Sequence, residues 1–277
     1  MRGWNLVLVA VAALLAASGC SQQDIGTFKR LGMPEPVTDR AVHTLHLWQG
    51  AWIAAFVIGF LVWGLIIWAV IAYRKRDDSI PKQTRYNIPV EVMYTVVPVI
   101  IVLVLFFYTV RTQDAVLATD EKVPPDQVIN VVGQQWSWTF NYLSKDEIGT
   151  DVYDTGTPSA FPTLYLPKGE RIGIRLTSPD VIHSFFVPAF LFKEDVFPGK
   201  ANYFEFTPTK EGTYAGKCAE LCGAYHSRML FTVKIVSPDT FEKHLHDLKA
   251  KGHTGQATGG VQSTTEAGLE PEGKGAK

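Results

Sequence analysis

The segment QWSWTFNY, residues 135–142, decides the fold of the C-terminal half of this 277-residue chain. Aromatic and polar residues alternate along it, so that Trp136, Trp138, Phe140 and Tyr142 share one face of an extended strand. The polar residues between them occupy the opposite face. This alternation is typical of a β-strand with one buried face.

Further short β-rich runs lie on both sides of this segment, between residues 128 and 236, and Gly, Pro and Asp separate them. They are VINVV (128–132), TLYLP (163–167), RIGIRLT (171–177), HSFFVP (183–188), NYFEFTP (202–208), GTYAG (212–216) and FTVKIV (231–236). Many short strands with turn residues between them predict an all-β sandwich or barrel of antiparallel strands.

The N-terminus has the features of an export signal. Arg2 precedes an uncharged run from Leu6 to Ala17, and small residues lead directly to Cys20. We therefore predict a signal peptide over residues 1–19, with Cys20 as the new N-terminus. Small residues before a cysteine are also typical of bacterial lipoproteins, in which that cysteine is lipidated.

Two apolar runs then predict a membrane hairpin. Residues 47–73 contain no charge, and about 20 apolar residues are enough to span a bilayer. The second run predicts a helix over residues 90–111. The loop between them, residues 74–89, carries five Lys and Arg residues, so we expect it on the cytoplasmic side.

This topology predicts a multi-pass protein of the bacterial cell membrane, with everything after residue 111 on the outer face. It gives an external linker over residues 20–46 and an external globular domain over residues 112–248. Residues 249–277 lack aromatic residues and are rich in Gly, Thr, Lys and Glu, which predicts a disordered tail. A net charge of −1 without a basic stripe gives no support to a nucleic-acid partner.

The stretch KCAELCGAYHSRM (217–229) gathers residue types that bind metals. Cys218 and Cys222 are four apart, His226 follows at the same spacing, and Met229 comes three residues later. In an exported protein the two cysteines alone predict a disulfide. A zinc site of two cysteines and two histidines is a second interpretation. The methionine at ligand spacing favours copper, because zinc does not use a thioether.

Two arrangements of copper are then open. A mononuclear blue-copper centre needs one cysteine, two histidines and a weak methionine ligand, which leaves one cysteine over. Two cysteines can instead bridge two copper ions, with His183 and His226 each capping one metal. Met229 is then a weak ligand to one copper, and a backbone carbonyl is a ligand to the other. An electron shared over two bridged metals changes each bond length little, so its transfer requires little reorganisation.

These residues resemble those of subunit II of the haem-copper cytochrome c oxidases. The family patterns C-x-E-x-C-x-x-x-H-x-x-M and H-S-x-x-V-P appear here as Cys218, Glu220, Cys222, His226 and Met229, and as His183, Ser184, Val187 and Pro188. The resemblance covers most of the chain from about residue 47 to residue 236. It implies a two-helix transmembrane hairpin and an all-β cupredoxin-like Greek-key sandwich.

The resemblance also implies a ligand set. Its members are Cys218 and Cys222 as bridging thiolates of a dinuclear copper A centre, His183, His226 and Met229 as terminal ligands, and Glu220 as the carbonyl ligand. The side chain of Glu220 is expected to bind a magnesium ion shared with subunit I. Haem is expected only in the partner subunit, because the chain has no C-x-x-C-H motif.

Two more residues gain a role only from the resemblance. In G-x-Q-W-x-W, Trp136 matches the tryptophan at which electrons enter from cytochrome c, whereas periodicity alone assigns it to the core. In E-x-x-x-T-x-x-P, Glu91 matches the glutamate at the mouth of a proton path into subunit I. Tyr94 and Phe185 stand where the family has tryptophans, and neither change removes a ligand.

The implied function is that of the electron-accepting subunit of cytochrome c oxidase. Electrons are expected to pass from cytochrome c, or a membrane-tethered c-type haem domain, to copper A and then to haem a of subunit I. There oxygen is reduced to water, coupled to proton pumping, and the chain alone is expected to be inactive. Further oxidase subunits and membrane lipids are the other expected partners. Between Asp114 and Asp154, eight acidic residues against Lys122 and Lys145 predict a negative surface that attracts a basic cytochrome.

Other functions fit parts of the pattern. A quinol oxidase subunit has a similar sandwich but lacks the copper ligands. A membrane-anchored copper-binding or copper-delivery protein without an electron-transfer role is another alternative. A copper store or chaperone predicts labile copper, and its function requires neither a two-helix hairpin nor an acidic surface around a tryptophan. The copper domain of nitrous oxide reductase shares the loop but belongs to a soluble enzyme with a large extra domain.

Overall fold

The computed structural model describes residues 22–81, 83–120, 122–144 and 148–258. The predicted signal peptide, Cys20 and most of the predicted tail lie outside these residues. The chain divides into two compact units, residues 1–35 and residues 36–277. The described part of the first unit contains the short helix α2 (Gln22–Lys29).

Two helices of the second unit have the length and hydropathy of membrane spans. They are α3 (Ala41–Ala72) and α4 (Ile88–Val116). Neither apolar segment is buried inside the chain, so both present apolar side chains outward. Both predicted helices are present: α3 begins before residue 47, and α4 extends beyond the predicted range of 90–111 at both ends.

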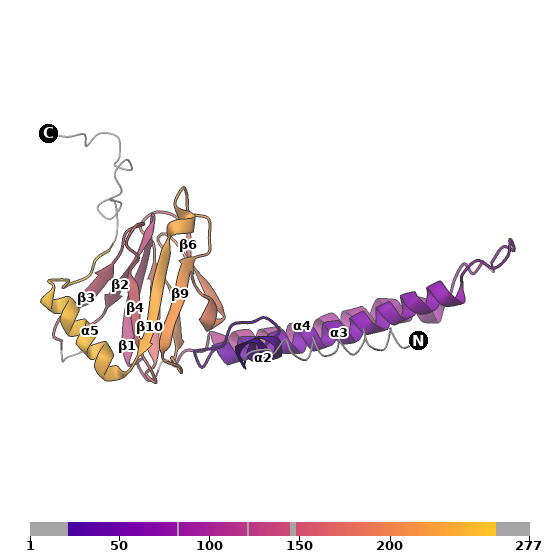
Figure 1. Cartoon of the computed structure of the whole chain (residues 1–277), viewed down its shortest axis with the longest axis horizontal. Coiled ribbons are helices and arrows are strands. Elements are labelled where there is room, and N and C mark those ends of the chain that lie inside the picture. The colour runs from indigo at the N-terminus through magenta and orange to yellow at the C-terminus, as the bar shows by residue number, and fades with distance from the viewer. Residues whose placement is uncertain (1–21, 82, 121, 145–147, 259–277) are drawn as a thin grey trace, which may run out of the picture. The chain divides into compact units, whose positions relative to one another are not determined.

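The rest of the second unit is a β-sandwich of two five-stranded sheets (Figure 1). One sheet has the order β3-β2-β1-β5-β8 and the other the order β4-β10-β9-β6-β7. The strands are β1 (Gln127–Gln134), β2 (Ser137–Tyr142), β3 (Val152–Thr155), β4 (Thr163–Pro167), β5 (Ile172–Thr177), β6 (His183–Val187), β7 (Phe192–Val196), β8 (Asn202–Phe206), β9 (Gly212–Cys218) and β10 (Leu230–Val236). Short 3₁₀ turns, η1 (Pro188–Phe190) and η2 (His226–Arg228), follow β6 and precede β10.

Most strand pairs are antiparallel, but β1 pairs with β5 and β4 pairs with β10 in parallel. The predicted sandwich is confirmed, but these two parallel pairs depart from the antiparallel pairing that was expected. Its core forms between the sheets, where Trp138 and Phe140 of β2 meet Phe231 of β10 at ring-centroid distances of 5.3 and 5.5 Å. The alternation in β2 positions these rings, because alternate side chains point to the same face.

The outward face of β2 is also buried. Thr139 hydrogen-bonds to Thr155 of β3 at 2.7 Å between their Oγ1 atoms. Asn141 forms a reciprocal pair of hydrogen bonds with the backbone of Ala257, at 3.0 and 2.7 Å. The segment after residue 250 thus lies against the sheet, and the folded part extends past residue 249, where the sequence predicted the tail to begin.

One further helix, α5 (Pro238–Ala250), follows β10 and was not predicted. Ser237 caps its first turn, because its hydroxyl accepts a hydrogen bond from Thr240 N. Phe241, Leu245 and Leu248 recur at helical spacing and are buried against the sandwich. The helix covers part of the apolar core near β3 and β4.

Candidate metal centre

Two neighbouring strands bring the predicted ligands together. Cys218 ends β9, the loop that follows carries Cys222 and His226, and Met229 directly precedes β10. His183 begins β6, which is paired with β9. The sheet therefore holds a ligand from a distant part of the sequence beside the loop, and a rigid scaffold under a functional loop is a common arrangement.

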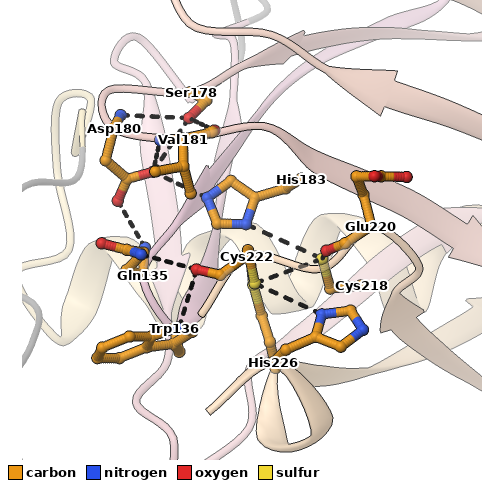
Figure 2. A network of polar contacts seen from close by, with 11 residues as sticks. Gln135, Trp136, Ser178, Asp180, Val181, His183, Cys218, Glu220, Cys222 and His226 are labelled. Atoms are coloured by element: carbon orange, nitrogen blue, oxygen red, sulfur yellow. Dashed lines mark hydrogen bonds and ion pairs between the residues drawn. The ribbon is translucent and has the colours of Figure 1, made fainter. Parts of the chain in front are cut away.

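The ligand atoms lie within a few ångströms of one another (Figure 2). The Sγ atoms of Cys218 and Cys222 are 3.8 Å apart. Nδ1 of His183 lies 3.9 Å from Cys218 Sγ, and Nδ1 of His226 lies 3.5 Å from Cys222 Sγ. Met229 Sδ lies 3.7 Å from Cys222 Sγ. Each sulfur of the pair thus has one imidazole nitrogen beside it.

Glu220 meets the cluster through its backbone. Its carbonyl oxygen lies 3.2 Å from Cys218 Sγ, whereas its side chain is exposed. The loop is closed by a hydrogen bond of 2.9 Å from Cys218 N to Met229 O, and Trp138 Nε1 donates to the same carbonyl at 3.3 Å. The loop is therefore held at both ends by groups that are themselves buried.

The donor set fits copper. Two sulfurs, two imidazole nitrogens, a thioether and a carbonyl surround one small volume, and soft sulfur ligands with imidazole favour copper over harder metals. Donor atoms that share a metal at bond lengths of about 2.0–2.3 Å lie roughly 3.3–3.8 Å apart. The separations of 3.5 to 3.9 Å are close to that range. Cys218, Cys222, His183 and Met229 are buried, so bulk water has little access.

The contact between the two cysteines favours the thiolate form of Cys218. The hydrogen bond from Cys222 lowers the pKa of Cys218, and His183 adds to this effect against the cost of burial. The same contact raises the pKa of Cys222 above its ordinary range, and burial adds to the rise. The pair loses its protons in two coupled steps. Since thiolate is the form of cysteine that binds metals, the site favours a cation at neutral pH.

Asp180 orients His183, a role that was not predicted from the sequence. Its Oδ1 atom accepts a hydrogen bond of 2.8 Å from His183 Nε2, which leaves Nδ1 facing Cys218. Burial opposes ionisation of Asp180, but hydrogen bonds from His183 and from the backbone of Gln135 and Val181 outweigh it, and the pKa is lowered. A carboxylate behind a metal-binding histidine fixes the ring and its tautomer. The spacing D-x-x-H, with Asp180 three residues before His183, is the sequence signal that could have predicted this role.

Gly133 of β1 makes room for the same histidine. A Cβ atom at this position would lie 3.2 Å from His183 Cδ2 and 3.1 Å from Trp138 Cζ3. These distances are shorter than most carbon contacts in packed interiors. Since β1 and β6 belong to different sheets, this close approach occurs where the two sheets meet.

Trp136 lies beside the loop, ahead of β2. Its Nε1 donates a hydrogen bond of 3.3 Å to the carbonyl of Cys222, and its ring meets Tyr225 edge-on at 5.3 Å between centroids. The side chain is half-buried and packs against the core cluster from one side. Trp136 is therefore next to the predicted metal ligands and also reaches the surface, unlike the fully buried Trp138.

The predicted functional residue Glu91 is not part of this cluster. Glu91 lies in the first turn of α4, where its carboxylate accepts a hydrogen bond of 2.9 Å from Asn87 N. Asn87 in turn accepts one from Val90 N, so the pair forms a reciprocal cap of the helix. Cys20 lies outside the described residues.

Comparison with known proteins identifies both parts of the chain. The family model described as the periplasmic domain of cytochrome c oxidase subunit II matches residues 127–236. The model described as the transmembrane domain of the same subunit matches residues 27–112. With the two apolar helices, these matches fit a membrane protein whose β domain lies on the outer face.

Several known proteins are similar to this chain. A probable cytochrome c oxidase subunit 2 of Streptomyces avermitilis is 48% identical and is matched over 93% of this chain and 90% of its own length. A protein of the same description from Streptomyces coelicolor is 47% identical with the same coverage. The crystal structure of the periplasmic domain of subunit II from Bradyrhizobium japonicum is 29% identical, covers 47% of this chain and 97% of its own, and gives a TM-score of 0.41. The family matches and the Streptomyces relatives show that the chain belongs to the cytochrome c oxidase subunit II family, the subunit through which electrons enter a haem-copper oxidase.

Proposed function

We propose that the chain holds two copper ions as a copper A centre and accepts electrons there. Cys218 and Cys222 bridge the metals, while His183 and His226 each complete one of them. The weaker ligands are Met229 and the Glu220 carbonyl. The observation that carries the proposal is the pairing of each sulfur with its own imidazole nitrogen, at 3.9 and 3.5 Å, around sulfurs that are 3.8 Å apart.

The same distances count against the other interpretations. A disulfide needs its sulfurs at about 2.05 Å, and within the described residues Cys218 and Cys222 are free thiols. A mononuclear blue-copper site leaves one cysteine without a role. A zinc site makes no use of the methionine sulfur, which lies 3.7 Å from Cys222 Sγ.

Bound copper supplies a one-electron redox couple. The residues of the chain give that couple a dry and pre-organised setting, because four of the ligands are buried and the loop is fixed by backbone hydrogen bonds. Asp180 holds His183 in one orientation. A pre-organised site rearranges little when it gains an electron, and this lowers the reorganisation energy of electron transfer.

Electrons enter at Trp136. Its hydrogen bond to the Cys222 carbonyl, with a half-buried ring, supports this role. The donor is cytochrome c or a membrane-tethered c-type haem domain, and the acidic residues between Asp114 and Asp154 attract its basic surface. The electrons leave towards haem a of subunit I.

The remaining roles depend on the assembled oxidase. The exposed carboxylate of Glu220 is the proposed ligand of a magnesium ion shared with subunit I. Glu91, at the cytoplasmic start of α4, stands at the opening of a proton path into that subunit. The two helices make the chain a multi-pass protein with its β domain outside, in contact with subunit I, further subunits and lipids.

Electron paramagnetic resonance of the purified full chain, reconstituted with copper, tests the centre. We expect two coppers per chain and a mixed-valence signal in which one unpaired electron is shared equally over both nuclei. Cys222→Ser removes one bridge, so the expected spectrum is that of a single localised copper. His246→Gln is a matched control, because this histidine is exposed on α5 outside the cluster.

A localised single-copper spectrum in the unaltered chain would reject the dinuclear assignment. Copper that a chelator removes within seconds, with no shared-electron signal, would instead favour a copper-delivery protein. Retention of the shared-electron signal in Cys222→Ser would show that this cysteine is not a bridge.

A further inference from the structure

Two hydrogen-bond donors converge on the backbone carbonyl of Cys222, a proposed metal ligand. Gln135 Nε2 donates at 2.7 Å and Trp136 Nε1 donates at 3.3 Å. Both donors come from the turn between β1 and β2, which belongs to the sheet opposite β6, β9 and β10. Figure 2 shows the two side chains reaching the same oxygen, Gln135 from the left and Trp136 from below.

The backbone of Gln135 is fixed as well. Its N–H donates to Asp180 Oδ2 at 2.7 Å, and the other oxygen of that carboxylate accepts from His183 Nε2 at 2.8 Å. Gln135 therefore contacts Cys222 directly and reaches His183 through Asp180. Among the described residues it is a link between the two segments that carry the proposed copper ligands.

Gly223 leaves the space that both donors need. A Cβ atom here would lie 3.0 Å from Trp136 Nε1 and 3.1 Å from Gln135 Nε2. The φ angle of Gly223 is +125°, a backbone conformation that residues with a Cβ atom rarely adopt. The loop is therefore shaped so that these two side chains reach the Cys222 carbonyl.

We propose that Gln135 is a positioning residue for electron uptake, which holds the Cys222 carbonyl, and with it Trp136, in one arrangement relative to the metal ligands. The uptake part of this inference rests on the proposed function. The step transfers one electron: the reduced haem iron of the donor becomes ferric, the copper centre is reduced by one electron, and no bond or proton is transferred. With the Gln135 amide absent, Trp136 alone holds the carbonyl, and the loop and indole sample other arrangements.

The first test uses the metal-free full chain and measures how fast a maleimide alkylates Cys218 and Cys222. Gln135→Leu keeps the approximate volume and removes the donor, whereas Gln135→Glu keeps the shape and places carboxylate oxygens near the carbonyl. We expect either change to raise the alkylation rate about fivefold, the factor that the net contribution of one neutral hydrogen bond gives in a local opening equilibrium. Gln134→Leu is the matched control, because the neighbouring glutamine bonds to Thr139 instead.

The second test uses the assembled, copper-loaded oxidase. With reduced cytochrome c as donor, we expect Gln135→Leu to lower the rate of electron uptake and kcat about fivefold while KM stays the same, since docking is unchanged and only the arrangement behind it is loosened. We expect Gly223→Ala to lower the rate of electron uptake as well, because its methyl group displaces both hydrogen-bond donors without removing either.

The outcomes separate the two proposals. Alkylation rates that are equal in Gln135→Leu and Gln134→Leu would overturn the positioning role, whatever metal the chain binds. Faster alkylation with unchanged electron uptake would also overturn it, since the loop would be loosened without consequence for Trp136. A single-copper spectrum in the unaltered chain would reject the proposed centre and leave the alkylation result standing.

Discussion

Strand β10 connects two regions that are built on different principles. At its beginning lies the loop of residues 218–229, where thiols, imidazoles and backbone carbonyls are held by hydrogen bonds. At its end lies α5, which is held mainly by the buried side chains of Phe241, Leu245 and Leu248. The comparison teaches that the chain separates the groups that perform chemistry from groups that stabilise the fold.

The two regions also tolerate change differently. Apolar packing depends on volume, and a change in one side chain is absorbed partly by its neighbours. A hydrogen-bonded metal site depends on direction, so a small displacement of one donor affects every group bonded to it. Substitutions at the α5 end should therefore alter stability, whereas substitutions at the loop should alter electron transfer.

The largest effect is expected from Phe241→Ala on α5. Phe241 is 3% exposed and its ring lies 5.8 Å from that of Tyr142. Loss of this side chain is expected to cost about 3–5 kcal/mol of unfolding free energy, the usual range for a buried phenylalanine. Chemical denaturation of the full chain in detergent measures it, with the partly exposed Phe161→Ala as control. A changed copper spectrum in the folded Phe241→Ala chain would contradict the separation of the two regions.

Trp136→Phe is expected to affect electron transfer and not stability. The phenyl ring preserves much of the packing but loses the N–H that reaches the Cys222 carbonyl. We expect electron uptake from reduced cytochrome c to fall on the order of a hundredfold, the loss that a misplaced reacting group commonly causes. The copper spectrum and the unfolding midpoint should stay the same. Rapid-mixing kinetics on the assembled oxidase measures the rate of electron uptake. An unchanged rate in Trp136→Phe would show that Trp136 is not the point of electron entry.

The smallest effect concerns pH and His244 of α5. Its ring stacks on Tyr165 at 3.7 Å between centroids, and among the described residues its Nε2 atom has no hydrogen-bond partner. The titratable groups around it are Tyr142, Tyr165, Lys234, Asp247 and Lys251. Burial lowers the pKa of His244 from 6.5 to about 4, and Lys251 adds to this shift.

Because the folded state disfavours the charged imidazole, the stability that neutral His244 contributes is complete above about pH 6.5 and is lost as the pH falls towards 4. After allowance for solvent screening, the loss is about 2 kcal/mol. Thermal unfolding of the full chain between these pH values measures it. His244→Phe should flatten the dependence, whereas His246→Phe, on the exposed side of α5, should leave it unchanged. If the stability of His244→Phe depends on pH as steeply as that of the unaltered chain, other groups cause the acid sensitivity.

Much of the fold could be predicted from local pattern, and the failures have a physical cause. The strands that the sequence analysis missed, β3 and β7, lie at sheet edges. The sequence of β7, FKEDV, carries three charged residues, and charges on edge strands hide the alternation while they block pairing with other chains. Helix α5 had a detectable signal in Ser237 followed by apolar residues at helical spacing.

The cluster of candidate metal ligands could be predicted because most of its residues lie within one loop at fixed spacing. The groups that support them could not, because Asp180, Gln135 and Gly223 are distant from one another in the sequence and meet only in the folded domain. The packing of the segment around Ala257 was missed for a similar reason: it is held by hydrogen bonds between the backbone of Ala257 and the side chain of Asn141, which leave no apolar pattern in the sequence.

The close fit of Gly133 to His183 across the two sheets has a consequence for biogenesis. In a sandwich whose halves have not yet packed together, the candidate ligands lack the groups of the opposite sheet that hold their loop, among them Gln135 and Trp138, so an immature chain should capture copper poorly. Metal occupancy then reports that folding is complete, and a bound ion resists reopening of the sheets, because any ligand that prefers the native state shifts the equilibrium towards it. Gly133→Ala would therefore impair maturation although it changes none of the candidate copper ligands.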